Sequence, residues 1–230
     1  IDFQNTYTIL VNPFPIFPQH LTIPDKDHTD QRILTKFKDM LKLAQSLDNY
    51  VIFYNGPKCG APAPDHMHFQ AGNKGFLPIE EEWSNKLAGK VIETGKSALW
   101  YLNDSPRNTL LIESYSIEEA SNIFSLIYQA MDILPGEEEP MMNVISWYET
   151  GKWIVCVFPR EKHRPSCYNL EGGMNILISP ASVDMGSVFI TPLEKDFERL
   201  SAADIDQILT EVCLPADKFQ QLKQRIKARL

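Results

Sequence analysis

The sequence predicts an α+β domain with a mostly antiparallel sheet and helices packed against it. Two observations support this fold class. Short β-rich runs follow one another at hairpin-like spacing near both ends of the chain, and the regular strand–helix alternation of a parallel sheet is not seen. A chain of 230 residues buries a full core. We therefore expect residues 1–230 to form a single domain.

The first part of the chain predicts four strands and one helix. The expected strands are residues 6–11, 19–23, 50–55 and 66–71, with a Pro-rich turn between the first two. Residues 31–47 repeat apolar side chains at helical spacing, and Asp30 is a suitable N-cap. This helix is expected to cover the sheet.

The middle of the chain is less regular. Between residues 76 and 113 the pattern weakens to short pieces, so an irregular excursion is expected there, at most with a strand pair. Ser116 and Glu119 then form a capping box that predicts a helix over residues 117–133, ending before Pro135. The acidic run 137–139 is interpreted as a solvated loop.

The last part predicts a hairpin, two more strands and two helices. Residues 142–148 and 153–158 flank a turn that contains Gly151, and residues 175–179 and 187–191 also have strand-like composition. Ser201 can cap a helix over 202–213, and Pro215 begins a final amphipathic helix that runs to Leu230.

Charge and composition limit the function classes. The formal net charge of −8 argues against binding to polynucleotides or anionic membranes, although a cleft can still accept a nucleotide. No run reaches the length of a membrane span, and no signal segment opens the chain. Free, scattered thiols suit a reducing cytoplasm, so a cytoplasmic protein is expected. The four cysteines are Cys59, Cys156, Cys167 and Cys213.

The most informative motif is His66-Met67-His68-Phe69-Gln70. Residues two apart in a strand point to the same face, so the side chains of His66, His68 and Gln70 are expected to project into one pocket. The preceding loop contains Gly56 and Gly60, where consecutive backbone N–H groups can surround an anion. An imidazole that faces a bound phosphate is the arrangement needed for a covalent phosphohistidine-type intermediate.

This motif and its loop resemble the active-site strand of the histidine triad (HIT-like) superfamily. Gln70 stands where the hydrolases of the superfamily carry a third histidine, so the resemblance is to the transferase branch. That branch includes galactose-1-phosphate uridylyltransferase, diadenosine tetraphosphate phosphorylase and the GDP-hexose phosphorylases. Residues 12–14 and 18–24 resemble the strands before the site, and residues 187–198 and 209–214 resemble the closing segments of the GDP-hexose phosphorylases.

The resemblance implies a HIT-like fold built as two related halves, at about residues 1–75 and 140–230. It also implies a further N-terminal segment, which in the family can supply base-binding residues and which we expect to be missing here. The expected substrate is a nucleoside-diphosphate sugar or a dinucleotide. The expected acceptor is inorganic phosphate or a sugar phosphate.

The resemblance also implies roles for the motif residues. His68 matches the nucleophile that attacks the α-phosphorus, and His66 matches a residue that orients it. Gln70 and the N–H groups around Gly60 and Ala61 would hydrogen-bond the phosphate oxygens. The nucleotide- and phosphate-binding residues predicted here are Asn55, Gly56, Lys58, Cys59, Gly60, Ala61, Arg160, Lys162 and Arg164.

The basic cluster at residues 160–164 has two interpretations. It is a solvated loop, or it is a phosphate clamp in which guanidinium groups bind phosphate oxygens in pairs. The clamp requires this cluster to lie near His68. The two interpretations have about equal support from the sequence.

A structural zinc ion is the alternative to a metal-free site. His28, His66 and Cys59 are conceivable ligands, but the sequence has no CxxC pair, so no metal or other cofactor is expected. The alternative function is a nucleotide-binding or regulatory module with little turnover. It is suggested by the loop at residues 59–62, where several relatives carry a serine that faces the phosphate and this chain does not.

Overall fold

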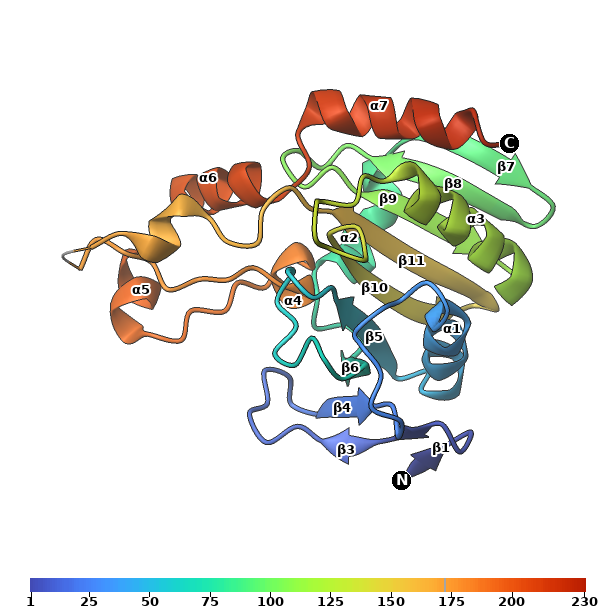
Figure 1. Cartoon of the computed structure of the whole chain (residues 1–230), viewed down its shortest axis with the longest axis horizontal. Helices are drawn as coiled ribbons and strands as arrows, with labels where there is room; N and C mark the ends of the chain where they lie inside the picture. Colours follow the sequence, from blue (N-terminus) through green and yellow to red (C-terminus); the bar gives the residue numbers. More distant parts are fainter. Residues whose placement is uncertain (172) are drawn as a thin grey trace.

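A single antiparallel sheet dominates the computed structural model, which describes residues 1–171 and 173–230 (Figure 1). Within the described residues the sheet has nine strands, and every neighbouring pair is antiparallel. In spatial order they are β3 (Leu10–Val11), β4 (His20–Pro24), β6 (His68–Asn73), β5 (Tyr50–Asn55), β10 (Met142–Glu149), β11 (Lys152–Pro159), β9 (Leu110–Ser114), β8 (Ser97–Leu102) and β7 (Leu87–Thr94). A separate ribbon pairs β1 (Asp2–Phe3) with β2 (Tyr7–Thr8). The predicted fold class is confirmed.

Three long helices cover one face of this sheet. They are α1 (Phe37–Ser46), α3 (Ile117–Ala130) and α7 (Ala216–Lys227), and Figure 1 shows them on the same side of the strands. The rings of Phe37 and Phe124 stack with centroids 3.9 Å apart, which joins α1 to α3. Trp153 of β11 donates an indole hydrogen bond to the Leu41 carbonyl at 2.8 Å and so anchors α1 to the sheet.

The opposite face is covered only in part. The single-turn helices α2 (Ile79–Glu82) and α4 (Ser182–Met185), the longer helix α6 (Ala202–Val212) and the turn η1 (Trp83–Lys86) pack on its apolar side chains. Along β5 the side chains alternate: Ile52 and Tyr54 join the core under the long helices, whereas Val51 and Phe53 join the second core. On this second face the ends of β5 and β6 open toward solvent, and the candidate site lies there.

Three predictions about the first half of the chain are wrong. The predicted strand 6–11 is divided into β2, which pairs with β1, and β3, which pairs with β4. Helix α1 begins at Phe37 and not at residue 31, and its N-cap position is Lys36, not Asp30. Residues 31–33 are not helical, because their backbone N–H groups bond to Pro64 and to the carboxylate of Glu139. The predicted excursion at 76–113 is regular and forms the three-stranded meander β7–β8–β9.

The hairpin β10–β11 and the helix capped by Ser116 agree with the prediction. So do the helix capped by Ser201 and the final helix after Pro215.

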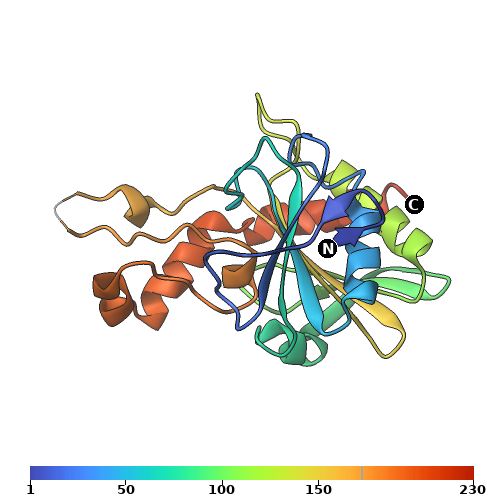
Figure 2. The ribbon, with the colours of Figure 1, turned by 90° about the horizontal axis from the view of Figure 1, so that it is seen from below.

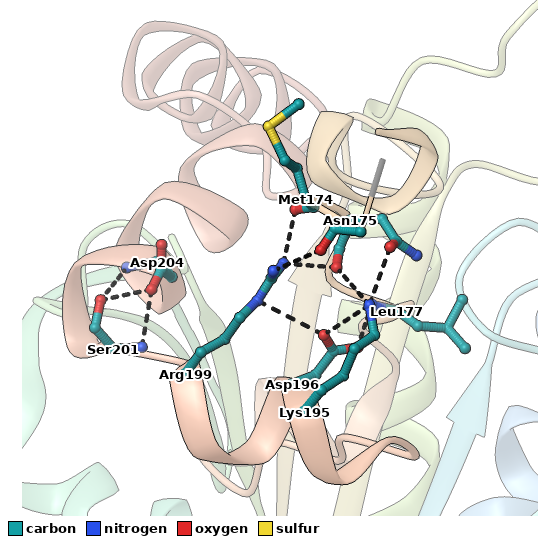
Figure 3. Close-up of polar contacts among 9 residues, drawn as sticks. Met174, Asn175, Leu177, Lys195, Asp196, Arg199, Ser201 and Asp204 are labelled. Carbon is teal, nitrogen blue, oxygen red and sulfur yellow. Dashed lines mark hydrogen bonds and ion pairs between the residues drawn. The ribbon is translucent and has the colours of Figure 1, made fainter. Parts of the chain in front are cut away.

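The predicted strands 175–179 and 187–191 are not strands. Residues 166–171, 173–180 and 188–200, which include η2 (Ser166–Asn169), extend from the sheet as an arm on either side of α4 in the sequence (Figure 2). Helix α5 (Glu194–Arg199) takes the place of a strand partner, as Figure 3 shows. Arg199 donates to the carbonyls of Met174 and Asn175 at 2.7 and 2.6 Å, and the fully buried Asp196 accepts from the Leu177 N–H at 2.8 Å. Side chains therefore satisfy the backbone of this segment.

None of the helices among the described residues is long and apolar enough to cross a membrane.

Candidate functional site

Three motif side chains share one pocket on the partly covered face of the sheet. Strand β6 begins at His68, so His66 stands just before it, but His66, His68 and Gln70 line the same cavity of about 210 Å³. The common pocket predicted for these three side chains is confirmed, but strand alternation explains only His68 and Gln70, because His66 lies in a bend before the strand. The other lining residues come from β4, from the loop before it and from the loop before β6: Asn12, Thr22, Pro24, Pro62 and Ala63.

The His68 ring is held in one tautomer. Its Nδ1 lies 2.8 Å from the carbonyl oxygen of His66, and a carbonyl only accepts, so Nδ1 carries the hydrogen. Nε2 therefore has a free lone pair, and no residue in the described part of the chain lies within hydrogen-bonding distance of it. The residue is 6% exposed, and burial lowers the pKa of its imidazole. The neutral ring lines the pocket, and its Nε2, which is buried, keeps an unpaired lone pair.

His66 is held by β4. Its Nε2 lies 2.8 Å from the carbonyl oxygen of Asp25, directly after that strand, and this carbonyl must accept a hydrogen from the ring. The backbone carbonyl of His66 is free to accept from His68. The orienting role predicted for His66 thus corresponds to a backbone contact.

The Gln70 amide is oriented by His20, which the sequence did not single out as a site residue. The Ile16 N–H donates to Nδ1 of His20 at 3.1 Å, so the hydrogen of that ring lies on Nε2. This Nε2 donates to Oε1 of Gln70 at 2.9 Å. The amide oxygen is therefore occupied, and the –NH₂ group of Gln70 remains as a pair of donors for a ligand.

A second, larger pocket of about 400 Å³ adjoins the first, and Pro62 and Gln70 line both. One side is formed by Phe53, Asn55 and Gly60 from β5 and the following loop. The other side comes from the arm and from α4. Its lining residues there are Tyr168, Leu177, Ser179, Ala181, Val183, Asp184, Ile190 and Pro192. The two pockets form a groove with Gln70 at its centre.

Asn55 joins β5 to the start of α4. Its Oδ1 accepts from the Ser182 N–H, the Ser182 hydroxyl and Nδ2 of Asn143, at 2.7–2.9 Å. Because the oxygen takes all three bonds, the –NH₂ group of Asn55 is the part left for the second pocket. Asn143 and Ser182 are distant in sequence and were not predicted.

The loop after β5 turns on Gly60. Its φ of +94° is unfavourable for other residues, and a Cβ there would lie 2.5 Å from the Cβ of Ala181. Gly56 and Cys59 face inward, because their N–H groups donate to Met142 and Gly56 carbonyls. The Cys59 thiol is fully buried, which raises its pKa to about 12. These contacts leave Gly56 and Cys59 to shape the loop and give no support for contact with phosphate.

Most of the predicted basic residues are engaged elsewhere. Arg160 is 4% exposed, and its guanidinium N–H groups donate to Val212, Asn143, Pro180, Lys162 and His163 oxygens at 2.6–3.2 Å. All five N–H groups of the side chain thus have acceptors, so Arg160 supports the loop through Asn143 and has no donor for a phosphate. Lys58 pairs with Glu137, and Lys162 lies 3.7 Å from a carboxylate oxygen of Glu211.

Arg164 is the member of the cluster that lies at the groove. Its guanidinium stacks over the Tyr168 ring at 4.2 Å, and its Nε donates to the Ser179 hydroxyl at 3.2 Å. Both partners line the second pocket. The side chain is exposed, so its remaining N–H groups are accessible at the rim.

The acidic run 137–139 is not a solvated loop as predicted. Glu139 is buried and accepts from the Tyr54 hydroxyl at 2.5 Å and from the Ile33 N–H at 2.7 Å. Burial raises the pKa of this carboxyl group to about 7. Glu138 pairs with Arg32. The run fastens the loop before β10 to the segment that precedes α1.

The side chains of His28, His66 and Cys59 do not gather as zinc ligands. The rings of His28 and His66 are in contact, with centroids 4.8 Å apart, but the Cys59 thiol is buried in the interior. Within the described residues, no group of three histidine, cysteine or carboxylate side chains is placed to hold a metal ion.

Two models of known protein families match this sequence. Residues 78–230 match the model described as "GDPGP1-like, C-terminal domain". The chain belongs to the GDPGP1-like family. Residues 1–73, which include the histidine motif, match a domain of unknown function, DUF4922. No curated protein matches the sequence.

Two solved structures with TM-scores above 0.5 share the fold of this GDPGP1-like chain. Yeast Ap4A phosphorylase Apa2 is 19% identical with a TM-score of 0.60, over 93% of this chain and 76% of that one. A DUF4931 family protein from Bacillus cereus is 16% identical with a TM-score of 0.52, over 81% and 97%. A uridylyltransferase mutant is 12% identical with a TM-score of 0.47, over 98% and 87%. The predicted HIT-like fold and superfamily are confirmed.

Proposed function

We propose that this protein is a nucleotidyltransferase of the phosphorylase type. It acts on a nucleoside-diphosphate sugar or a dinucleoside polyphosphate through a covalent nucleotidyl-His68. The observation that carries this proposal is the His68 ring, which lines the pocket, bonds a carbonyl through Nδ1–H and keeps a buried Nε2 lone pair without a partner among the described residues. Membership of the GDPGP1-like family supports a transferase of nucleotides.

The first step is attack of His68 Nε2 on the α-phosphorus. A P–N bond forms and the P–O bond to the leaving group breaks, so the electron pair leaves on a sugar 1-phosphate or a nucleoside polyphosphate. The ring becomes positively charged, and the His66 carbonyl that accepts from Nδ1–H stabilises this charge. The –NH₂ group of Gln70 donates to the phosphate oxygens as negative charge develops on them.

The second step reverses the chemistry with another acceptor. An oxygen of inorganic phosphate or a sugar phosphate attacks the phosphorus, the P–N bond breaks, and the electron pair returns to Nε2. His68 is then neutral again. Neither step requires a metal-bound nucleophile.

The groove suits a substrate with an organic group on each side of the phosphates. One pocket lies beside His68 and the other beside Asn55, and both meet at Gln70. The larger pocket combines the Tyr168 ring and apolar side chains with the –NH₂ group of Asn55. A ring system with a polar edge, such as a base or a hexose, has this chemistry. Arg164 at the rim is the remaining candidate for a phosphate contact from the basic cluster.

The alternative is a nucleotide-binding module with little turnover. It is favoured by one observation: Arg160 and Lys58 are committed to protein partners, so few cations remain near the pocket.

Covalent labelling distinguishes the two functions. We expect incubation with GDP-glucose, UDP-glucose or diadenosine tetraphosphate, each labelled at the α-phosphate, to leave acid-labile label on the protein. His68→Ala should abolish the label and leave nucleotide binding largely intact, because the imidazole acts in the chemical step. Gln70→Ala should slow labelling by about 10²–10³-fold, the usual effect of losing one preorganised donor.

Native protein that binds a nucleotide but takes no label from any of the three would favour the binding module. Labelling that persists in His68→Ala at the native rate would contradict the nucleophile assignment.

A further inference from the structure

The pairing of strands β5 and β6 ends beside His68. Their register runs from Tyr50↔Asn73 to Phe53↔Gln70 and stops there, although β5 extends to Asn55 and β6 begins at His68. Both ends remain in the sheet through their outer neighbours, because Asn55 pairs with β10 and His68 pairs with β4. Continued along the same register, Asn55 and His68 would face each other, and their backbone groups must therefore find other hydrogen-bond partners.

The side chain of Gln31 bonds to both of these residues. Its Nε2 donates to the carbonyls of Asn55 and His68 at 2.9 and 3.1 Å, and its Oε1 accepts from the His68 N–H at 2.8 Å. A primary amide has a carbonyl like that of a peptide unit and one more N–H, so this one side chain bonds two carbonyls and the His68 N–H while holding the strands apart. Gln31 is 0% exposed, and its amide satisfies both backbone groups of His68.

The backbone around Gln31 reinforces this wedge. The Gln31 N–H donates to the Pro64 carbonyl at 3.0 Å, and the Met67 N–H donates to the Thr29 carbonyl at 2.6 Å. The segment before α1 is thus laid along the loop that leads into β6. The bond from His68 Nδ1 to the His66 carbonyl spans two residues of this same loop, so its geometry depends on that backbone.

We propose that Gln31 is a positioning residue for the His68 nucleophile. By fixing both backbone groups of His68, it keeps the ring at the orientation in which Nδ1–H meets the His66 carbonyl and the Nε2 lone pair has no partner in the described part of the chain. The effect of Gln31 on the reaction rests on the function proposed above. Its effect on the orientation and tautomer of the His68 ring does not depend on that function.

Two variants of Gln31 and one control test the role in the reaction. Gln31→Leu keeps the approximate volume but removes the amide, and Gln31→Glu keeps the shape but places a carboxylate against two carbonyl oxygens. Trp153→Phe is the matched control, because it also removes a buried side-chain N–H that donates to a backbone carbonyl, at α1 and away from the site. We expect both Gln31 variants to slow single-turnover labelling by about 10²-fold, the effect of a misplaced reacting group, while the nucleotide Kd changes little. Trp153→Phe should be destabilised yet label at the native rate.

The pH profile separates positioning from general loss of structure. On acidification the carboxylate that Gln31→Glu introduces gains one O–H donor, so the labelling rate of this variant relative to the native protein should rise as the pH falls. The same ratio for Gln31→Leu should stay flat. Native-rate labelling in Gln31→Leu, or a fall in all three variants in proportion to their lost stability, would overturn the proposal.

The ring itself provides a readout that does not depend on activity. Nitrogen-15 NMR of the native protein should show His68 as the Nδ1–H tautomer, and Gln31→Glu should show exchange between tautomers. An unchanged, single Nδ1–H tautomer in both Gln31 variants would overturn the positioning role. If the native protein takes no label from any nucleotide but the tautomer responds to Gln31, the proposed function fails and the positioning role stands.

Discussion

At the scale of single residues, backbone groups set the chemistry of the side chains in the groove. A carbonyl oxygen fixes the hydrogen of His68 on Nδ1, and an N–H group fixes the hydrogen of His20 on Nε2. The first contact leaves the Nε2 lone pair of His68 free, and the second presents the –NH₂ group of Gln70. Opposite tautomers in the two rings thus leave one unprotonated ring nitrogen and one oriented donor.

The pH dependence of labelling should report the state of His68. Burial lowers the pKa of this imidazole, and only the neutral ring is a nucleophile. We expect the single-turnover rate to be constant above about pH 6.5, the ordinary pKa of histidine, and to fall tenfold per pH unit below a lower apparent pKa. Rapid-quench labelling of the native protein measures this profile.

Gln70→Ala serves as the control for that profile. It removes a donor to phosphate without touching the His68 ring, so its rate should be lower at every pH with the same acidic limb. An apparent pKa above the ordinary histidine value would contradict the effect of burial.

The same scale shows what the sequence could and could not predict. Alternation along a strand is a local property, so it correctly grouped His68 and Gln70, whereas His66 reaches the same pocket from the bend before β6. Gln31 and Asn143 belong to other segments and reach the site only through tertiary packing. Likewise, the sequence shows that residue 160 is an arginine, but it does not show which protein oxygens accept the N–H groups of Arg160.

At the scale of elements, contacts between loops shape the groove. The alternating residues 175–179 look like a strand, but Ile176 and Ile178 pack against Ile208 of α6, and side chains of α5 satisfy the backbone. The arm can therefore line the second pocket without a strand neighbour. The loop after β5 meets the start of α4 where Gly60 contacts Ala181.

Substitution of Gly60 should reveal how closely these elements approach. Gly60→Ala adds a methyl group 2.5 Å from the Cβ of Ala181 at a φ of +94°, so we expect a loss of roughly 1–3 kcal/mol in unfolding free energy. Gly75→Ala is the matched control, because its φ is +77° but nothing lies within 4 Å of the new Cβ. It should be destabilised less in urea titrations.

A second substitution separates crowding from backbone strain. Ala181→Gly removes the methyl group that Gly60→Ala meets, so the double variant should recover the part of the stability that Gly60→Ala loses beyond Gly75→Ala. Additive losses in the double variant would show that crowding between the loop and α4 is not the cause.

At the scale of the whole molecule, adjacent hairpins made the fold class predictable. Strands β10 and β11 follow one another in sequence, as do β7, β8 and β9. The last three were not predicted, because apolar and polar residues alternate only weakly along them. The connections between distant segments were not predictable. Glu139 is one of these, because it joins the loop before β10 to Tyr54 of β5 and to the segment that leads into α1.

Glu139 should make the stability of the whole protein depend on pH. Its pKa is raised by burial from 4.5 to about 7, so the folded protein holds this proton more tightly than the unfolded chain. Its contribution is complete below pH 4.5 and is lost as the pH rises through about 7. The loss is on the order of 3 kcal/mol.

We expect Glu139→Gln to remove this dependence, because a neutral amide can still accept from the Ile33 N–H and donate to the Tyr54 hydroxyl. Urea titrations from about pH 5 to pH 8 should show the unfolding free energy of the variant rising relative to the native protein. Asp184, whose pKa is raised to about 6 by burial, titrates in both proteins and cancels in the difference. Glu138→Gln, at the exposed neighbouring position, should give a nearly flat difference. A flat difference for Glu139→Gln as well would mean that Glu139 is ionised in the fold throughout this range.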